Sequence, residues 1–124
     1  MIAYSTVGTN DMAKAKEFYT SLFAEAGIKP MMDMGRFVAF GNAPNRPMFS
    51  IAEPFDGNEA APGNGNMVAI AAASPEQVST LYEKAISLGG TCEGKPGPRQ
   101  GGAFTCGYVR DLDGNKLNFF CMGT

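Results

Sequence analysis

Only a few side chains in this sequence could bind or transform a small molecule, and one asparagine is the most informative of them. Asn118 stands between Leu117 and Phe119 in an otherwise apolar segment. A buried amide needs hydrogen-bond partners. Those partners are either groups of a bound molecule or groups of a neighbouring strand, and the sequence leaves both interpretations open.

Arginine and tyrosine side chains supply further candidates. Arg99 ends the segment KPGPR (residues 95–99), where two prolines predict a stiff loop. Its guanidinium could bind a carboxylate or phosphate there, or be solvated. Arg36, which follows Gly35, allows the same two interpretations. Tyr4 could donate a hydrogen bond or a proton, or it could pack with its hydroxyl at the surface.

Methionine is frequent, with eight in 124 residues, and Met31, Met32 and Met34 stand close together. Flexible thioether side chains suit an adaptable apolar pocket, and they also fill irregular cores. The sequence is compatible with either use.

Histidine is absent, which excludes many kinds of chemistry. Without imidazole there is no serine–histidine or cysteine–histidine pair and no histidine ligand for zinc. The three cysteines, Cys92, Cys106 and Cys121, have no CxxC spacing and are odd in number, which is typical of a reducing compartment.

Charge and hydropathy narrow the partners. Ten basic and twelve acidic residues give a net charge of −2, and the basic residues are scattered, so we expect no nucleic-acid partner. No apolar stretch approaches the ~20 residues that a bilayer requires, and no secretion signal is recognised at the N-terminus. We therefore expect a cytoplasmic protein without a membrane partner.

The elements that must position these side chains follow one order twice. In the first half, a strand is followed by a capped helix and three strands, at residues 2–7, 12–26, 29–34, 36–41 and 47–53. After a linker, the second half repeats this order at residues 67–73, 75–88, 91–93, 103–110 and 116–122. A loop is expected at residues 94–102, and a four-residue turn at 112–115 would set Cys106 opposite Cys121.

A constant spacing relates the two halves. An offset of 63 residues carries Tyr4 to Met67 and the predicted cap Asp11 to the cap Ser74. Near the ends of the halves the offset becomes 68, because the second half holds extra residues, and it carries Ser50 to Asn118.

The repeat predicts an α+β fold of two βαβββ modules that form a cup-shaped mixed sheet with the helices on the outside. We expect one domain over residues 1–124, with module one at about 1–53, a linker at about 54–66 and module two at about 67–124. Strand alternation then directs Tyr4, Met67 and Asn118 into the cup, and Leu117 and Phe119 toward the helices.

Several short motifs together resemble the glyoxalase, bleomycin-resistance and extradiol dioxygenase family, the vicinal oxygen chelate superfamily. They are TVGTND at residues 6–11, FY at 18–19, Gly27, GNG at 63–65 and DLDGNK at 111–116. The resemblance spans essentially the whole chain. It implies the cup, and it also implies a homodimer.

In members with a metal, the family places ligands in the first and last strand of each module. The resemblance maps these positions onto Tyr4, Ser50, Met67 and Asn118. Tyrosine, serine, methionine and asparagine supply neither carboxylate nor imidazole to a divalent cation. We therefore expect no metal and no cofactor.

The resulting hypothesis is a protein that binds a small organic molecule in the cup without a metal. Its expected lining residues are Tyr4, Ser50, Met67, Arg99 and Asn118. One alternative is a lyase or isomerase of the glyoxalase type, related to lactoylglutathione lyase, acting on a small oxygenated substrate or a thiol adduct, for which no catalytic residue is assigned. Another alternative is an interaction domain whose cup is filled by its own side chains.

Overall fold

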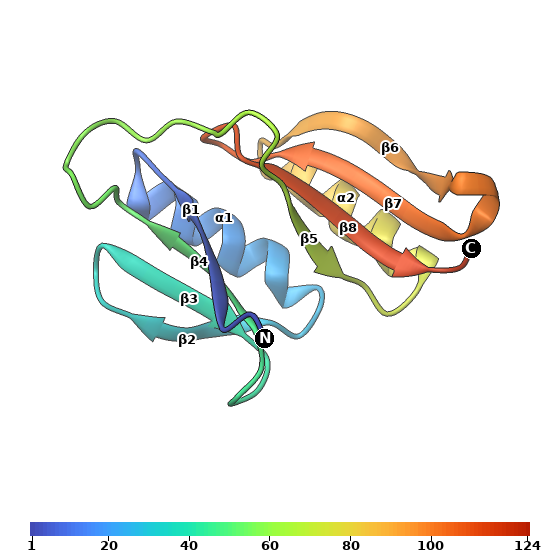
Figure 1. Ribbon diagram of the computed structural model, residues 1–124, viewed down its shortest axis with the longest axis horizontal. Coiled ribbons are helices and arrows are strands. Elements are labelled where there is room, and N and C mark those ends of the chain that lie inside the picture. The colour runs from blue at the N-terminus through green and yellow to red at the C-terminus, as the bar shows by residue number, and fades with distance from the viewer. The chain divides into compact units, whose positions relative to one another are not determined.

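The computed structural model describes residues 1–124, which divide into two units, Met1–Pro62 and Gly63–Thr124 (Figure 1). Unit one, called module one below, contains β1 (Tyr4–Gly8), α1 (Met12–Ala24), β2 (Lys29–Asp33), β3 (Phe37–Gly41) and β4 (Met48–Ala52). Unit two, module two, contains β5 (Val68–Ala71), α2 (Pro75–Ser87), β6 (Thr91–Arg99), the 3-10 turn η1 (Gln100–Gly102), β7 (Phe104–Arg110) and β8 (Lys116–Met122). The predicted α+β class with two βαβββ modules is confirmed.

Each module builds a four-stranded mixed sheet with the same topology. The strand order is β1-β4-β3-β2 in module one and β5-β8-β7-β6 in module two. The first and last strands of each module are parallel neighbours, with Thr6 opposite Ser50 and Ala69 opposite Asn118. Ser50 and Asn118 therefore occupy equivalent places, as the sequence offsets predict.

The two helices begin at the predicted caps. The Asp11 carboxylate accepts a hydrogen bond from the Lys14 backbone N–H at 3.1 Å, and the Ser74 hydroxyl accepts one from Gln77 at 3.1 Å. These caps satisfy backbone donors that the first helical turn leaves free. Both helices run for 13 residues, so the offset of 63 holds across the whole element.

An aromatic cluster fills the space between α1 and its sheet. Tyr19 and Phe23 of the helix contact Phe40 and Phe49 of the strands, with ring centroids 4.8–6.1 Å apart. All four rings are buried. Because side chains alternate along a strand, the neighbouring residues of β3 and β4 point to the opposite face of the sheet, which has no helix of module one against it.

Module two follows the same plan with smaller side chains. Val78 of α2 and Leu117 and Val109 of the strands are fully buried. Gly107 of β7 faces the helix, since a Cβ there would lie 3.5 Å from Val78 and Tyr82. The side chains that alternate with these residues occupy the sheet face away from α2. We call this face of each sheet its open face.

Two local predictions in module two are wrong. The segment expected to be a loop at residues 94–102 continues β6 to Arg99, because irregularities between Cys92 and Gly97 absorb the extra residues within the strand pairing.

The second error concerns the turn before β8, which has five residues and not four. Arg110 pairs with Lys116, and the Asp111 carboxylate accepts hydrogen bonds from the Asp113 and Asn115 backbone N–H groups at 2.9 Å. This shifts the register by one, so Cys106 lies opposite Phe120. A one-residue shift reverses the face, and Cys106 therefore lies on the open face.

Neither helix is long and apolar enough to cross a membrane.

Candidate functional site

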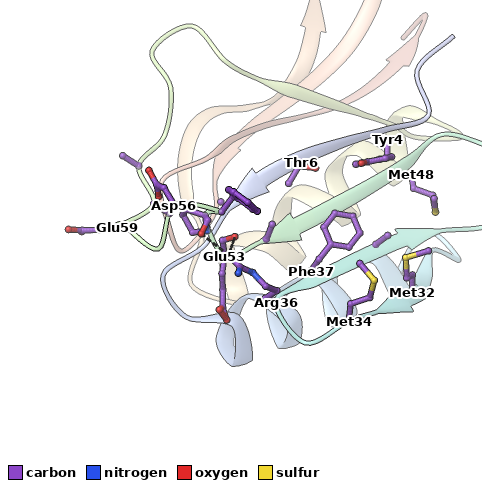
Figure 2. A pocket seen from close by; sticks show the side chains of 17 residues that line it. Tyr4, Thr6, Met32, Met34, Arg36, Phe37, Met48, Glu53, Asp56 and Glu59 are labelled. Atoms are coloured by element: carbon purple, nitrogen blue, oxygen red, sulfur yellow. Dashed lines mark hydrogen bonds between the residues drawn. The ribbon is translucent and has the colours of Figure 1, made fainter.

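The open face of module one carries a pocket of about 890 Å³ (Figure 2). Alternate residues of all four strands line it, and the segment after β4 closes one side. Its wall includes Tyr4 and Thr6 of β1, Phe37 of β3 and Met48 of β4. The pocket lies entirely within residues of module one.

Methionine and aromatic side chains make most of the pocket wall apolar. Met32, Met34 and Met48 line it together with Phe37 and Tyr4. The Tyr4 and Phe37 rings meet edge to face, with centroids 5.8 Å apart. Figure 2 shows Met32 and Met34 beside Phe37, on the side away from Tyr4. Because thioethers change rotamer at little cost, this wall can adapt to ligands of different shape.

The polar end of the pocket is formed where β4 ends. The Arg36 guanidinium donates hydrogen bonds to the carbonyls of Pro54 at 2.8 Å and of Glu53 at 3.4 Å. Hydrogen bonds from Asn58, with its backbone N–H the largest cause, lower the pKa of Asp56 below its usual value. Arg36 therefore holds the chain as it leaves β4, and Asp56 carries a negative charge there at neutral pH.

A second, polar pocket of about 470 Å³ shares Arg36, Glu53, Pro54 and Glu59 with the first. Asn10 also lines it and ties the segment after β4 to module one, because its side chain donates to the Ala60 carbonyl at 3.0 Å and accepts from the Ala60 N–H at 2.7 Å. The first residues of the predicted linker thus form part of the pocket wall.

Tyr4 and Ser50, two of the predicted site residues, have different roles on this face. Tyr4 is half exposed, at 54%, and lines the pocket. Ser50 is fully buried, and its hydroxyl donates to the Ser5 carbonyl at 2.7 Å and lies 2.7 Å from the Thr6 hydroxyl. Because Ser50 has one proton, Thr6 must donate to it, and the Thr6 oxygen keeps only acceptor capacity toward the pocket.

Sequence reasoning did not identify Thr6 as a pocket residue. The available signal was its position two residues after Tyr4, on the same face of the same strand. Phe37 was missed for a similar reason, because nothing in an apolar strand distinguishes a wall residue of a pocket from a core residue.

Met67 and Arg99 belong to module two. Met67, at 44% exposure, directly precedes β5. Arg99 is the last residue of β6, and its guanidinium donates to the carbonyls of Gly97, Pro98 and Lys95 at 2.8–3.2 Å. The same group lies 5.6 Å from the centre of the Tyr108 ring. These bonds orient the guanidinium over the ring and use much of its donor capacity.

Asn118 lies beside that ring. It is only 5% exposed, its neighbour in the β7–β8 pairing is Tyr108, and its side-chain oxygen Oδ1 is buried with no hydrogen-bond partner. The Lys116 ammonium lies 5.3 Å from the Tyr108 ring centre. The pKa of Tyr108 is raised, chiefly by a hydrogen bond with Cys106 and secondly by burial, so the phenol is neutral at pH 7.

The structure therefore brings the predicted residues together within each module. Ser50 is hydrogen-bonded to Thr6, which lines the same pocket as Tyr4 on the open face of module one. Arg99 and Asn118 both adjoin Tyr108 on the open face of module two. Tyr108 and Lys116 were not identified from the sequence, since their importance depends on the β7–β8 register.

The residues at the positions that the family resemblance assigns to a metal do not fit a divalent cation. Tyr4, Ser50, Met67 and Asn118 supply no carboxylate and no imidazole, and the Ser50 hydroxyl is occupied by Ser5 and Thr6. No group of three or more histidine, cysteine, aspartate or glutamate side chains is placed to hold a metal ion.

Comparison with known proteins identifies the family. The profile of the Glyoxalase/Bleomycin resistance protein/Dioxygenase superfamily matches residues 1–119. Among solved structures, a glyoxalase/bleomycin resistance protein from Albidiferax ferrireducens T118 is 36% identical, with a TM-score of 0.88 and 97% of both chains covered.

More distant structures share the fold. A glyoxalase-related enzyme from Fulvimarina pelagi is 21% identical, with a TM-score of 0.76 over 97% of this chain and 86% of its own. Glyoxalase I from Zea mays is 21% identical, with a TM-score of 0.75 over 99% of this chain and 45% of its own. No curated protein matches significantly. The chain belongs to the glyoxalase/bleomycin resistance protein/dioxygenase superfamily.

Proposed function

We propose that this protein binds a small, largely apolar organic molecule on the open face of module one, without a divalent metal. The observation that carries the proposal is the pocket of about 890 Å³ with its methionine and aromatic wall. A pocket of this size and composition is typical of small-molecule sites. Transfer of the ligand's apolar surface out of water supplies the driving force.

Polar groups at the pocket determine how a ligand is oriented. The Thr6 oxygen accepts a hydrogen bond from a ligand hydroxyl or amine, because its own proton is used by Ser50. Tyr4, whose ring lies against Phe37, adds a phenol that can donate. In this proposal Tyr4 contacts the ligand on module one, and Ser50 acts only through Thr6. Met67, Arg99 and Asn118 belong to module two and are proposed contacts of a separate ligand on its own open face.

The pocket also bears on the two alternatives. Side chains of module one leave the pocket open, which favours a binding protein over an interaction domain with a filled cup. A lyase or isomerase of the glyoxalase type needs a general base and a stabiliser for the negative charge that develops on oxygen. The lowered pKa of Asp56 makes it a weak base, and Arg36 donates to backbone carbonyls, so binding is the better-supported function.

The test is a screen of small acids, thiol conjugates and aromatic antibiotics for thermal stabilisation. The shift in melting temperature is compared between the wild type and a variant whose pocket is blocked. A ligand at 100-fold over its dissociation constant adds about 2.7 kcal/mol to stability. Ala52→Leu places a larger side chain in the pocket wall, and Ala24→Leu, on the exposed side of α1, is the matched control. We expect stabilisation of the wild type and of Ala24→Leu, and its loss in Ala52→Leu.

Two results would contradict the proposal. One is that no compound stabilises the wild type, and the other is that a hit stabilises Ala52→Leu equally well. The lyase alternative is tested separately: without turnover of the methylglyoxal–glutathione adduct in the presence of added metals, that activity is excluded.

A further inference from the structure

A buried hydrogen-bond acceptor without a partner is the main anomaly of module two. Asn118 is only 5% exposed to solvent, and its Oδ1 accepts no hydrogen bond. Desolvating an amide oxygen without replacing its hydrogen bonds costs free energy, so such atoms are rare in folded proteins. A donor from outside the module would remove this cost.

Comparison of the two modules explains why the atom has no partner. In module one, Ser50 lies opposite Thr6, and the two hydroxyls lie 2.7 Å apart. In module two, the equivalent of Ser50 is Asn118, but the residue opposite it is Ala69, which has no hydroxyl. Module two thus lacks the internal donor that its twin provides at the same place.

Positive charge is in excess beside Asn118. Lys116 lies two residues earlier on the same face of β8, with its ammonium 5.3 Å from the centre of the neutral Tyr108 ring. No salt bridge joins this ammonium to a carboxylate. Glu93, the nearby carboxylate, is bound by Arg110 at 2.6 Å. A ligand carboxylate would therefore meet an unpaired cation.

Apolar side chains continue the face on the other side of Asn118. Phe120 is the next residue on this face of β8, and its ring lies 5.3 Å from that of Phe104 on β7. Cys106, opposite Phe120, completes this end. A cation, an unpaired acceptor and an aromatic pair thus follow one another along the face.

We infer that the open face of module two binds a hydroxy acid, whose hydroxyl donates to Asn118 Oδ1, whose carboxylate pairs with Lys116 and whose apolar part lies against Phe120 and Phe104. Two residues on a strand span about 6.7 Å, and the flexible lysine stem covers the remaining distance to a carboxylate next to the hydroxyl. The inference deepens the proposed function, on which it rests for the premise that an open sheet face is a ligand site. Arg99, bonded to carbonyls, holds the Tyr108 ring in place and contributes charge.

Mandelate and phenylacetate provide a direct test, because they share the phenyl ring and the carboxylate and differ only in the hydroxyl. Both are titrated into the labelled protein, and binding is followed by the NMR shifts of the backbone amides of β8, which every variant retains. We expect mandelate to bind at least fivefold more tightly than phenylacetate, as a hydrogen bond to an unsatisfied buried acceptor provides.

Three variants assign the effect to its atoms. Asn118→Leu should remove the preference for mandelate, and Lys116→Gln should weaken both acids. Ala69→Thr leaves Asn118 in place and supplies the internal donor that Thr6 supplies to Ser50, so it should reduce the preference for mandelate. Ala69→Val has the same shape without the hydroxyl and should keep the preference.

Equal affinity of the two acids for the wild type would overturn the inference, and so would binding of neither at tens of millimolar. A preference for mandelate that survives both Asn118→Leu and Ala69→Thr would also overturn it. Failure of the inference is distinguishable from failure of the proposed function. If the mandelate test fails but Ala52→Leu still blocks a ligand of module one, only the Asn118 subsite is refuted. If mandelate is preferred but no ligand depends on Ala52, only the module-one proposal fails.

Discussion

Substitution of Ala69 tests the unsatisfied amide without any ligand. The structure places Ala69 opposite Asn118, where a threonine would present its hydroxyl as Thr6 does to Ser50, 2.7 Å away. A net hydrogen bond stabilises a protein by about 0.5–1.5 kcal/mol, and satisfying a buried acceptor belongs to the upper part of that range. We therefore expect Ala69→Thr to be more stable than Ala69→Val by about 1 kcal/mol.

Valine is the appropriate reference because both side chains are branched at Cβ and have similar strand propensity. The free energy of unfolding is measured by urea denaturation for both variants, in the wild-type background and with Asn118→Leu. In the second background the difference between threonine and valine should vanish, which gives a coupling energy of about 1 kcal/mol for the pair.

The reasoning is refuted if threonine is no better than valine in the wild-type background, or if its advantage is the same without Asn118. In module one, Thr6→Val provides the reverse experiment. It removes a donor from Ser50 but leaves the Ser50 hydroxyl bonded to Ser5, so it should cost only about 0.5–1.5 kcal/mol.

Four further predictions concern packing, pH, metals and assembly. Gly94→Ala would set a Cβ 2.9 Å from the Tyr108 ring, and we expect a loss of about 1–3 kcal/mol in unfolding free energy together with movement of that ring, seen in its NMR signals. The pKa of Tyr82 is raised from 10.0 to about 12, chiefly by a hydrogen bond with Cys92 and secondly by burial. Its neutral form therefore stabilises the fold below pH 10, this contribution is lost as pH rises through 12, and Tyr82→Phe should flatten the stability profile in that window. Protein purified without chelator should carry no stoichiometric zinc, nickel, iron or manganese by elemental analysis, and one tightly held ion per chain would contradict the assignment of the donor set. We also propose a homodimer, as the family resemblance implies, and a monomer at micromolar concentration in light scattering would refute it.

The order of the elements could be predicted because their sequence signals are local. Capping residues and apolar spacing define both helices, and the offset of 63 residues between Asp11 and Ser74 carries through to the structure. Only the start of β6, at residues 91–93, could be predicted. The glycines and prolines that follow are typical of a loop, and only pairing with β7 keeps them extended. The predicted β7–β8 register was wrong by one residue. The number of residues in the turn depends on how the Asp111 carboxylate binds the backbone, which the sequence does not show.

The residues of the candidate site also differ in whether the sequence alone could identify them. Tyr4 and Asn118 are identifiable because each is a polar group at a strand position whose alternation can be counted. Thr6 and Tyr108 are not, because their roles arise from the residue paired with them on a neighbouring strand. Arg36 was correctly noticed but its carbonyl partners at the end of β4 follow only from the tertiary structure.

The two modules illustrate how a repeat can diverge without loss of its fold. Most helix-facing positions remain apolar in both copies because the core requires it, whereas the open-face positions differ more between the copies. At one equivalent pair of positions, module one has two hydroxyls joined by a hydrogen bond, and module two has an alanine and an amide whose Oδ1 accepts none. The first arrangement suits a pocket wall that binds chiefly through apolar contact, and the second retains a directional acceptor at some cost in stability. Such a cost is easier to understand at a place where a ligand supplies the missing donor, which is why we place the specific recognition of a hydroxyl in module two.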